Sequence, residues 1–196
     1  MTTKIDSQEG YFSGKLLIAM PSMTDPRFHR AVIFMCAHDE EGAMGLVLNK
    51  PLPNVDFSDL LAQLDIKAAN GTEKDGQDIP VLSGGPVENA RGFILHGNDF
   101  TEPDTVKVGD DFGVTGTIEA IRKITNGNAP ENMLFALGYA GWSAGQLDQE
   151  LQANAWLTLD ADESIMFHSK ADEKWDLAIA KLGIDPGLLS AEGGHA

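Results

Sequence analysis

The chain has 196 residues, of which 42% are hydrophobic and 22% are charged, a composition typical of one globular domain and not of a disordered chain. Its formal net charge is -16, and because phosphate-backbone contacts depend on Lys and Arg, this charge argues against direct binding to nucleic acid. No apolar run approaches the roughly 20 residues that span a bilayer, and the amino terminus lacks a secretory pattern. We therefore expect a cytoplasmic protein without membrane contact.

The first part of the chain alternates apolar runs with polar turns. Residues 14–20, 30–37 and 43–50 are short runs rich in β-forming side chains, which predicts buried strands. In residues 56–65 the apolar side chains recur every three or four positions. This period predicts a helix that Asp56 caps.

The middle of the chain predicts strands before a second helix. Residues 68–78 are polar and contain two glycines, which predicts a flexible loop. Residues 81–87, 92–97 and 111–116 are strand-like. Residues 117–127 begin with a threonine suited to capping, place isoleucines on one face and end near a glycine, which predicts a helix.

The last part of the chain alternates between the two kinds of element. Residues 133–140 and 155–160 predict strands, whereas residues 143–154 and 169–183 predict amphipathic helices, the latter capped by Ser169. Across the whole chain, strands often follow strands without an intervening helix. This order favours an α+β fold over a doubly wound parallel sheet.

The domain limits follow from the same pattern. We expect a single domain over residues 14–185, flanked by a flexible amino-terminal tail of residues 1–13 and a carboxy-terminal tail of residues 186–196.

The sequence Gly-Trp-Ser-Ala-Gly around Ser143 matches the nucleophile elbow of serine hydrolases, Gly-x-Ser-x-Gly. An aspartate, Asp160 or Asp162, followed by His168 would complete a triad in the required chain order. The same serine lies three residues before Gln146 at a predicted helix start, which is the spacing of a capping box. A cap requires neither histidine nor substrate pocket, so we predict that Ser143 is structural and that the chain has no catalytic residue.

The remaining reactive side chains predict no metal site and no cofactor. His38 stands in the densest polar group, His-Asp-Glu-Glu-Gly, but neighbouring residues in one turn rarely converge on an ion, which favours a solvated loop. His96 ends an apolar strand and is expected to be a hydrogen-bonded core histidine. Cys36, the single cysteine, lies in an apolar run and is expected to be a buried thiol.

Taken together, several stretches resemble the YqgE/AlgH family of bacterial proteins over about residues 14–183. They are GKLLIAMPSMTDPRFHRAVIFMCAHDEEGAMGLVLNKP, SGGPV and LGYAGWSAGQLDQEL, in this order. The matching positions are Pro21, Asp25, Pro26, Phe28, Arg30, His38, Gly42, Gly45, Asn49, Pro51, Gly84, Gly85, Pro86, Gly138, Tyr139, Gly141, Trp142, Gly145 and Gln146. The resemblance implies an α+β fold in which a branched β-sheet forms a pseudo-barrel with helices outside.

The resemblance implies little about activity. Some members are labelled transcriptional regulators linked to exopolysaccharide control, and no catalytic residue can be carried over. Members commonly have a residue other than serine at the position of Ser143, which favours the structural interpretation.

Two hypotheses of function remain beside the serine hydrolase. The first is a protein-interaction module that regulates gene expression indirectly, and the second is a protein that binds a small anionic ligand near glycine-rich turns. Both would use motif residues at the ends of predicted strands, where sites are usually found. The candidates are Arg30, His38, Asn49, Gly84, Gly85, Tyr139, Trp142 and Gln146. In the alternative without a site, Arg30 pairs with Asp25 and Trp142 belongs to the core.

Overall fold

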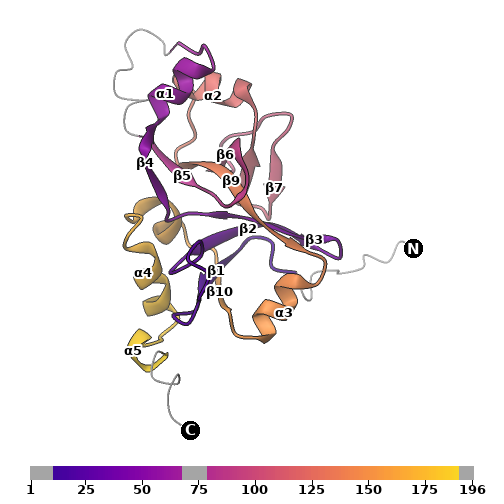
Figure 1. The fold of residues 1–196 in the computed structure, drawn as a ribbon. Coiled ribbons are helices and arrows are strands. Elements are labelled where there is room, and N and C mark those ends of the chain that lie inside the picture. Colours follow the sequence, from indigo (N-terminus) through magenta and orange to yellow (C-terminus); the bar gives the residue numbers. More distant parts are fainter. Residues whose placement is uncertain (1–10, 68–78, 190–196) are drawn as a thin grey trace, which may run out of the picture.

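The computed structural model describes residues 11–67 and 79–189 (Figure 1). Its strands are β1 (Lys15–Ala19), β2 (Val32–Asp39), β3 (Gly42–Val47), β4 (Pro51–Asp56), β5 (Pro80–Ser83), β6 (Val87–Gly97), β7 (Val106–Val108), β8 (Phe112–Thr115), β9 (Met133–Ser143) and β10 (Trp156–Asp160). Its helices are α1 (Phe57–Gln63), α2 (Ile118–Thr125), α3 (Gln146–Gln152), the π-helix η1 (Ser164–His168), α4 (Lys174–Lys181) and α5 (Pro186–Leu189). The α+β fold predicted from the sequence is confirmed.

The strands form one curled, mainly antiparallel sheet in the order β10-β1-β2-β3-β9-β6-β8-β7. The long strand β9 is where the sheet branches. Its amino-terminal part pairs with β6 on one side and, in parallel, with β5 on the other. Its carboxy-terminal part pairs with β3 through Gly42↔Ser143 to Gly45↔Ala140. Strands β1–β3 and β10 therefore lie on one arm of the sheet, and β4–β8 on the other.

Apolar side chains fill three clusters around this sheet. The first lies between the two arms and under η1 and α4, and it includes Phe34 and Trp175. The second lies on the opposite face of β1 and β2 and is covered by α3. The third packs α1 and α2 against β5, β6 and β9. Since β1 and β2 are covered on both faces, their sequences are continuous apolar runs without polar alternation.

The first two helices begin where the sequence predicts. Thr117 caps α2, because its hydroxyl accepts a hydrogen bond from the backbone N–H of Ala120. Asp56 is the residue before α1, but its side chain makes no hydrogen bond to that helix. The capping position was therefore predicted correctly at Asp56, whereas the capping bond was not.

The predicted start of the last helix at Ser169 is wrong. A π-helix, η1, occupies Ser164–His168, and α4 begins only at Lys174. The Ser169 hydroxyl donates to the carbonyl of Ile165 instead of capping α4. Lys174 is buried, and its Nζ donates to the carbonyls of Ile165, Met166 and Ser169 at 2.8–3.0 Å. The three carbonyls in and just after η1 thus give the buried ammonium group its hydrogen-bond acceptors, which explains how a lysine is accommodated in the core.

The structure also describes residues 11–13 and 186–189, on either side of the domain 14–185 drawn from the sequence. Phe12 packs on the second apolar cluster and stacks on His38, with ring centroids 5.6 Å apart. At the other end, α5 includes Pro186–Leu189. The predicted flexible loop 68–78 lies outside the described residues.

Candidate functional site

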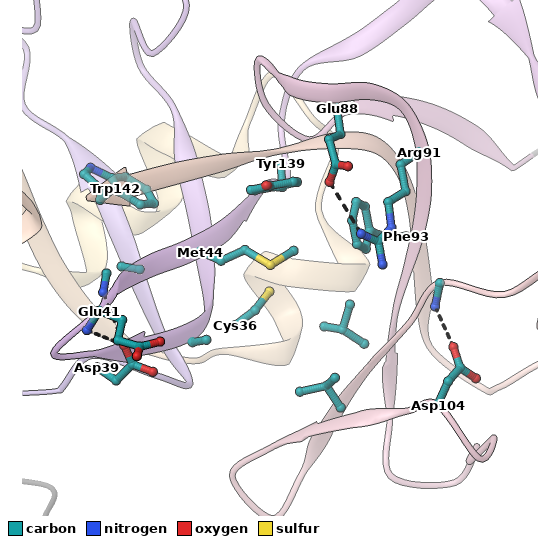
Figure 2. A pocket seen from close by; sticks show the side chains of 16 residues that line it. Cys36, Asp39, Glu41, Met44, Glu88, Arg91, Phe93, Asp104, Tyr139 and Trp142 are labelled. Carbon is teal, nitrogen blue, oxygen red and sulfur yellow. Dashed lines mark hydrogen bonds and ion pairs between the residues drawn. The ribbon is translucent and has the colours of Figure 1, made fainter. Parts of the chain in front are cut away.

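A groove of about 610 Å³ opens where the two arms of the sheet diverge from β9. Its floor is apolar, and its residues come from β2, β3, β6, β7, β8 and β9: Cys36, Met44, Phe93, Val106, Val114 and Tyr139. Figure 2 shows the sulfur atoms of Met44 and Cys36 facing the central space of the groove, with Tyr139 and Phe93 beyond them. We call this feature the groove.

An irregularity in β2 contributes two consecutive residues to the groove. The pairing of β2 with β3 shifts register between Met35 and Ala37, so that Cys36 has no partner of its own. A bulge of this kind interrupts the alternation of a strand. As a result both Cys36 and Ala37 line the groove, while His38 turns to the other side. Burial raises the pKa of the Cys36 thiol to about 12.

Val106 is the most exposed residue of the floor. It is 57% exposed, although it lies in a strand beside other apolar side chains of the groove. Val106 on β7 is the direct cross-strand partner of Val114 on β8. The two valines therefore form a short apolar row, and a bound molecule could cover the exposed part of Val106.

Five charged residues surround the floor. Asp39, Glu41, Glu88 and Asp104 form what we call the acidic rim, and Arg91 is the cation among them. Arg91 contacts Glu88 at 3.4 Å and lies over the ring of Phe93, 5.0 Å from its centroid. Four carboxylates against one guanidinium give the groove a formal charge of -3.

Trp142 and Gln146 belong to a hydrogen-bond network centred on Glu150 of α3. Glu150 accepts the indole N–H of Trp142 at 2.9 Å and that of Trp156 at 2.8 Å. Its other oxygen accepts from the Gln146 amide at 2.9 Å. The Gln146 oxygen in turn accepts from the backbone N–H and the hydroxyl of Ser143. The network fixes α3 on the end of β9, with Trp142 at the edge of the groove.

The capping role predicted for Ser143 is wrong. Ser143 is the last residue of β9, and Gly145, at a φ of 72°, precedes the first helical residue of α3. The glutamine side chain reaches back to the serine N–H as in a capping box, but the serine hydroxyl bonds to that glutamine and not to the helix backbone. A glycine at positive φ provides the turn from strand to helix.

His38 is a packed histidine beside α3. It is 7% exposed and contacts the rings of Tyr11, edge to face, and Phe12, stacked, at centroid distances of 5.3 and 5.6 Å. Its Nδ1 accepts the backbone N–H of Phe12, and its Nε2 lies 3.8 Å from a carboxylate oxygen of Asp148. The solvated loop predicted from its acidic neighbours is therefore wrong for His38, although Asp39, Glu40 and Glu41 are exposed.

Arg30 and Asn49 lie together, away from the groove. The Arg30 guanidinium stacks on Trp175 at 4.4 Å and pairs with Asp176 at 2.5 Å. Arg30 does not pair with Asp25, which binds Arg27 instead. The side-chain amide of Asn49 accepts the backbone N–H of Val32 and donates to the carbonyl of Arg30. It thus makes the hydrogen bonds that the backbone of a neighbouring strand would otherwise make where β2 begins.

Gly84 and Gly85 allow two backbones to cross. The Gly84 N–H donates to the carbonyl of Leu137, and its own carbonyl accepts from Val47, which joins β3, β5 and β9. A Cβ at Gly84 would overlap the carbonyl oxygen of Gly138, and one at Gly85 would overlap the backbone of Tyr139. Both glycines are therefore explained by close packing and do not require a ligand.

The predicted site residues thus fall into separate groups. Tyr139 and Trp142 line the groove, and Gln146 and His38 contact elements beside it. The sequence analysis missed Met44, Phe93, Val106 and the acidic rim. These residues carry no motif, and only the pairing of distant strands brings them together.

The residues considered for catalysis or metal binding have other partners. Asp160 pairs with Lys15 and Asp162 with Lys181, while the Ser143 hydroxyl bonds to Gln146. Within residues 11–67 and 79–189, no group of three or more His, Cys, Asp or Glu side chains is placed to hold a metal ion. His96 is a core histidine as predicted: it is fully buried and hydrogen-bonded to the Gly97 carbonyl and the Thr115 hydroxyl.

Comparisons with known proteins agree with the fold and define the family. In the part of the chain that the structure describes, no helix has the length and apolar character needed to cross a membrane. A UPF0301 protein of Bradyrhizobium diazoefficiens is 48% identical over 97% of this chain and 91% of its own length. A UPF0301 protein of Rhodospirillum rubrum is 45% identical over the full length of both chains.

Two solved structures share the fold. The solution structure of the AlgH protein from Pseudomonas aeruginosa superposes with a TM-score of 0.77 at 39% identity, covering 97% of this chain and 98% of that one. A crystal structure of a Corynebacterium diphtheriae protein has the same fold, with a TM-score of 0.70 at 19% identity over 91% of each chain. The AlgH-like family model matches residues 16–187. The chain is a member of the AlgH-like family.

Proposed function

We propose that the protein is a non-enzymatic protein-interaction module of the bacterial cytoplasm that regulates gene expression indirectly, and that the groove is its binding surface. The observation that carries the proposal is an exposed valine, Val106, in an apolar floor made by Met44, Phe93, Val114 and Tyr139. Apolar side chains gathered in a concave surface are typical of a binding site.

The rigidity of the floor supports the proposal. Its residues come from paired strands, and Trp142 at its edge is fixed by Glu150. A surface that keeps its shape loses little conformational freedom on binding, which favours association.

The alternative expectation, a small anionic ligand, has less support. The groove carries a formal charge of -3, which repels anions. Arg30, the cation expected to hold such a ligand, is already engaged by Asp176 and Trp175.

The test compares three forms of the protein as bait in extracts of the source bacterium. They are the parent, Val106→Gln in the groove and Leu177→Gln on α4, where Leu177 is 44% exposed and outside the groove. Both substitutions replace an exposed apolar side chain by a neutral polar one. We expect proteins that bind to the parent and to Leu177→Gln but are lost with Val106→Gln. The same proteins on all three baits, or none on any, would contradict the proposal.

A further inference from the structure

The distribution of charge around the groove determines which kind of partner it fits. Asp39 accepts hydrogen bonds from the backbone N–H groups of Glu41 and Gly42, and Asp104 from Gly116 and the Thr117 hydroxyl. All of these donors are neutral, so none of them forms an ion pair with either carboxylate. Among the described residues, no Lys, Arg or His forms an ion pair with Asp39, Glu41 or Asp104.

The cation at the groove is neutralised within the protein. Arg91 pairs with Glu88 and lies against Phe93, so it does not balance the other three carboxylates. A partner that fills the groove therefore meets three exposed negative charges.

These carboxylates lie at two ends of the apolar floor. Asp39 and Glu41 belong to the β2–β3 hairpin, and Asp104 precedes β7. Figure 2 shows the hairpin pair on one side and Asp104 on the other, with the sulfur atoms of Cys36 and Met44 between them. A ligand with one charged end would reach one group only. An elongated ligand with cations on both sides of an apolar centre would reach both.

We infer that the groove binds a segment of a partner protein in which a large apolar side chain is flanked on both sides by Lys or Arg. This inference rests on the proposed function and adds the chemistry of the partner. Lys and Arg suit the site because their aliphatic stems can lie along the apolar floor while their charged ends reach the acidic rim. The net charge of -16 attracts such a segment from a distance and repels an acidic one.

The test uses three synthetic hexapeptides with the same central Leu-Phe pair and with two Lys, two Gln or two Glu residues on each side. Binding is followed by amide chemical shifts of isotopically labelled full-length protein, read at Met44, Val106 and Tyr139. We expect the Lys peptide to bind most tightly and the Glu peptide least. Raising the salt concentration should weaken only the Lys peptide markedly, because salt screens exposed charges.

Two variants with the same change in net charge show where the attraction arises. Asp39→Asn with Glu41→Gln removes the hairpin carboxylates, and Asp172→Asn with Glu173→Gln removes a neighbouring pair of acids outside the groove. We expect the hairpin variant to bind the Lys peptide about two- to tenfold more weakly, the range for one or two exposed ion pairs, and the matched variant to bind like the parent.

The outcomes distinguish the two proposals. If the Gln and Glu peptides shift the groove amides as strongly as the Lys peptide, the groove binds protein segments and the inference about basic residues is wrong. An equal loss in both variants would also overturn it, because the attraction would then come from the overall charge. If no peptide shifts the groove amides at millimolar concentration, the proposed function fails as well.

Discussion

Glu150 connects two tryptophans that belong to different strands. Its carboxylate accepts the indole N–H groups of Trp142 on β9 and Trp156 on β10. Glu150→Gln keeps the shape but replaces one acceptor oxygen by a donor, so either the two indole N–H groups, which share one oxygen, lose their acceptor or the Gln146 amide loses its own. We expect a loss of about 1–3 kcal/mol in the free energy of unfolding, measured in urea. Glu40→Gln, at an exposed position, should change it little, and an equal loss in both variants would contradict the role of Glu150.

Ser143 provides a second test at the same network. Its hydroxyl is exposed, and its backbone N–H bonds to the same oxygen of Gln146. Ser143→Ala should therefore lower the free energy of unfolding by less than about 0.5 kcal/mol, whereas Gln146→Ala also removes a bond to Glu150 and should cost about 1 kcal/mol. Folded protein should not react with a fluorophosphonate probe. Labelling at Ser143 would support a hydrolase instead.

Because of Cys36, we expect the free energy of unfolding to fall as the pH becomes alkaline. Burial raises its pKa from 9.0 to about 12, so the folded chain keeps the thiol proton that the unfolded chain releases above pH 9. This contribution to stability is fully present below pH 9 and is lost as pH rises toward 12. Between pH 9 and 10.5, the free energy of unfolding should fall more steeply for the parent than for Cys36→Ala. Parallel curves would show that the thiol does not contribute.

At the scale of the elements, the crossing of the β5–β6 turn over β9 leaves no room for a side chain. Gly84→Ala places a Cβ on the Gly138 carbonyl, which is backbone and cannot rotate away. We expect a loss of at least about 2 kcal/mol or failure to fold, as for other overpacked sites. Gly116→Ala, whose Cβ would meet its nearest atom at 3.5 Å, should be tolerated. Circular dichroism melting curves compare the two, and similar melting temperatures would contradict the steric explanation.

Element type was predicted well where apolar residues repeat regularly. The runs that became β1, β2 and β9 and the period of α1 and α2 are local signals, so the sequence contains them. Strand β4 was missed because two prolines in Pro51–Asp56 argue against a strand, but its pairing with β5 involves only Pro51↔Leu82 and Asp56↔Pro80. The π-helix η1 depends on Lys174, a residue from the next helix, and no local pattern predicts it.

The site was harder to predict than the elements for a physical reason. Motif residues such as Gly84 and Asn49 are constrained by backbone crossings and strand ends, so they mark the scaffold. Groove residues such as Val106 and Met44 look like ordinary strand residues, and their common location results from strand pairing over long separations. Two of the predicted candidates, Tyr139 and Trp142, do line the groove, because both belong to β9, the strand from which the two arms of the sheet diverge.

The charge of the whole molecule predicts its behaviour toward nucleic acid. With 30 acidic and 14 basic residues, the surface offers few cations to replace phosphate counterions. We expect no specific binding to promoter fragments in fluorescence anisotropy, even at low salt. Sub-micromolar binding that survives an excess of competitor DNA would contradict this expectation and would point to direct regulation.

The position of β9 in the chain has a consequence for synthesis on the ribosome. Strands β3, β5 and β6 all pair with β9, which begins at Met133, and β1 pairs with β10 still later. The strands made first therefore leave the ribosome with open, apolar edges, because the strands that will pair with them have not yet been synthesised. Such edges can pair with other chains, so we expect the nascent chain to be prone to aggregation until β9 has been made. A nascent chain that stalls before Met133 should be a substrate for chaperones and proteases.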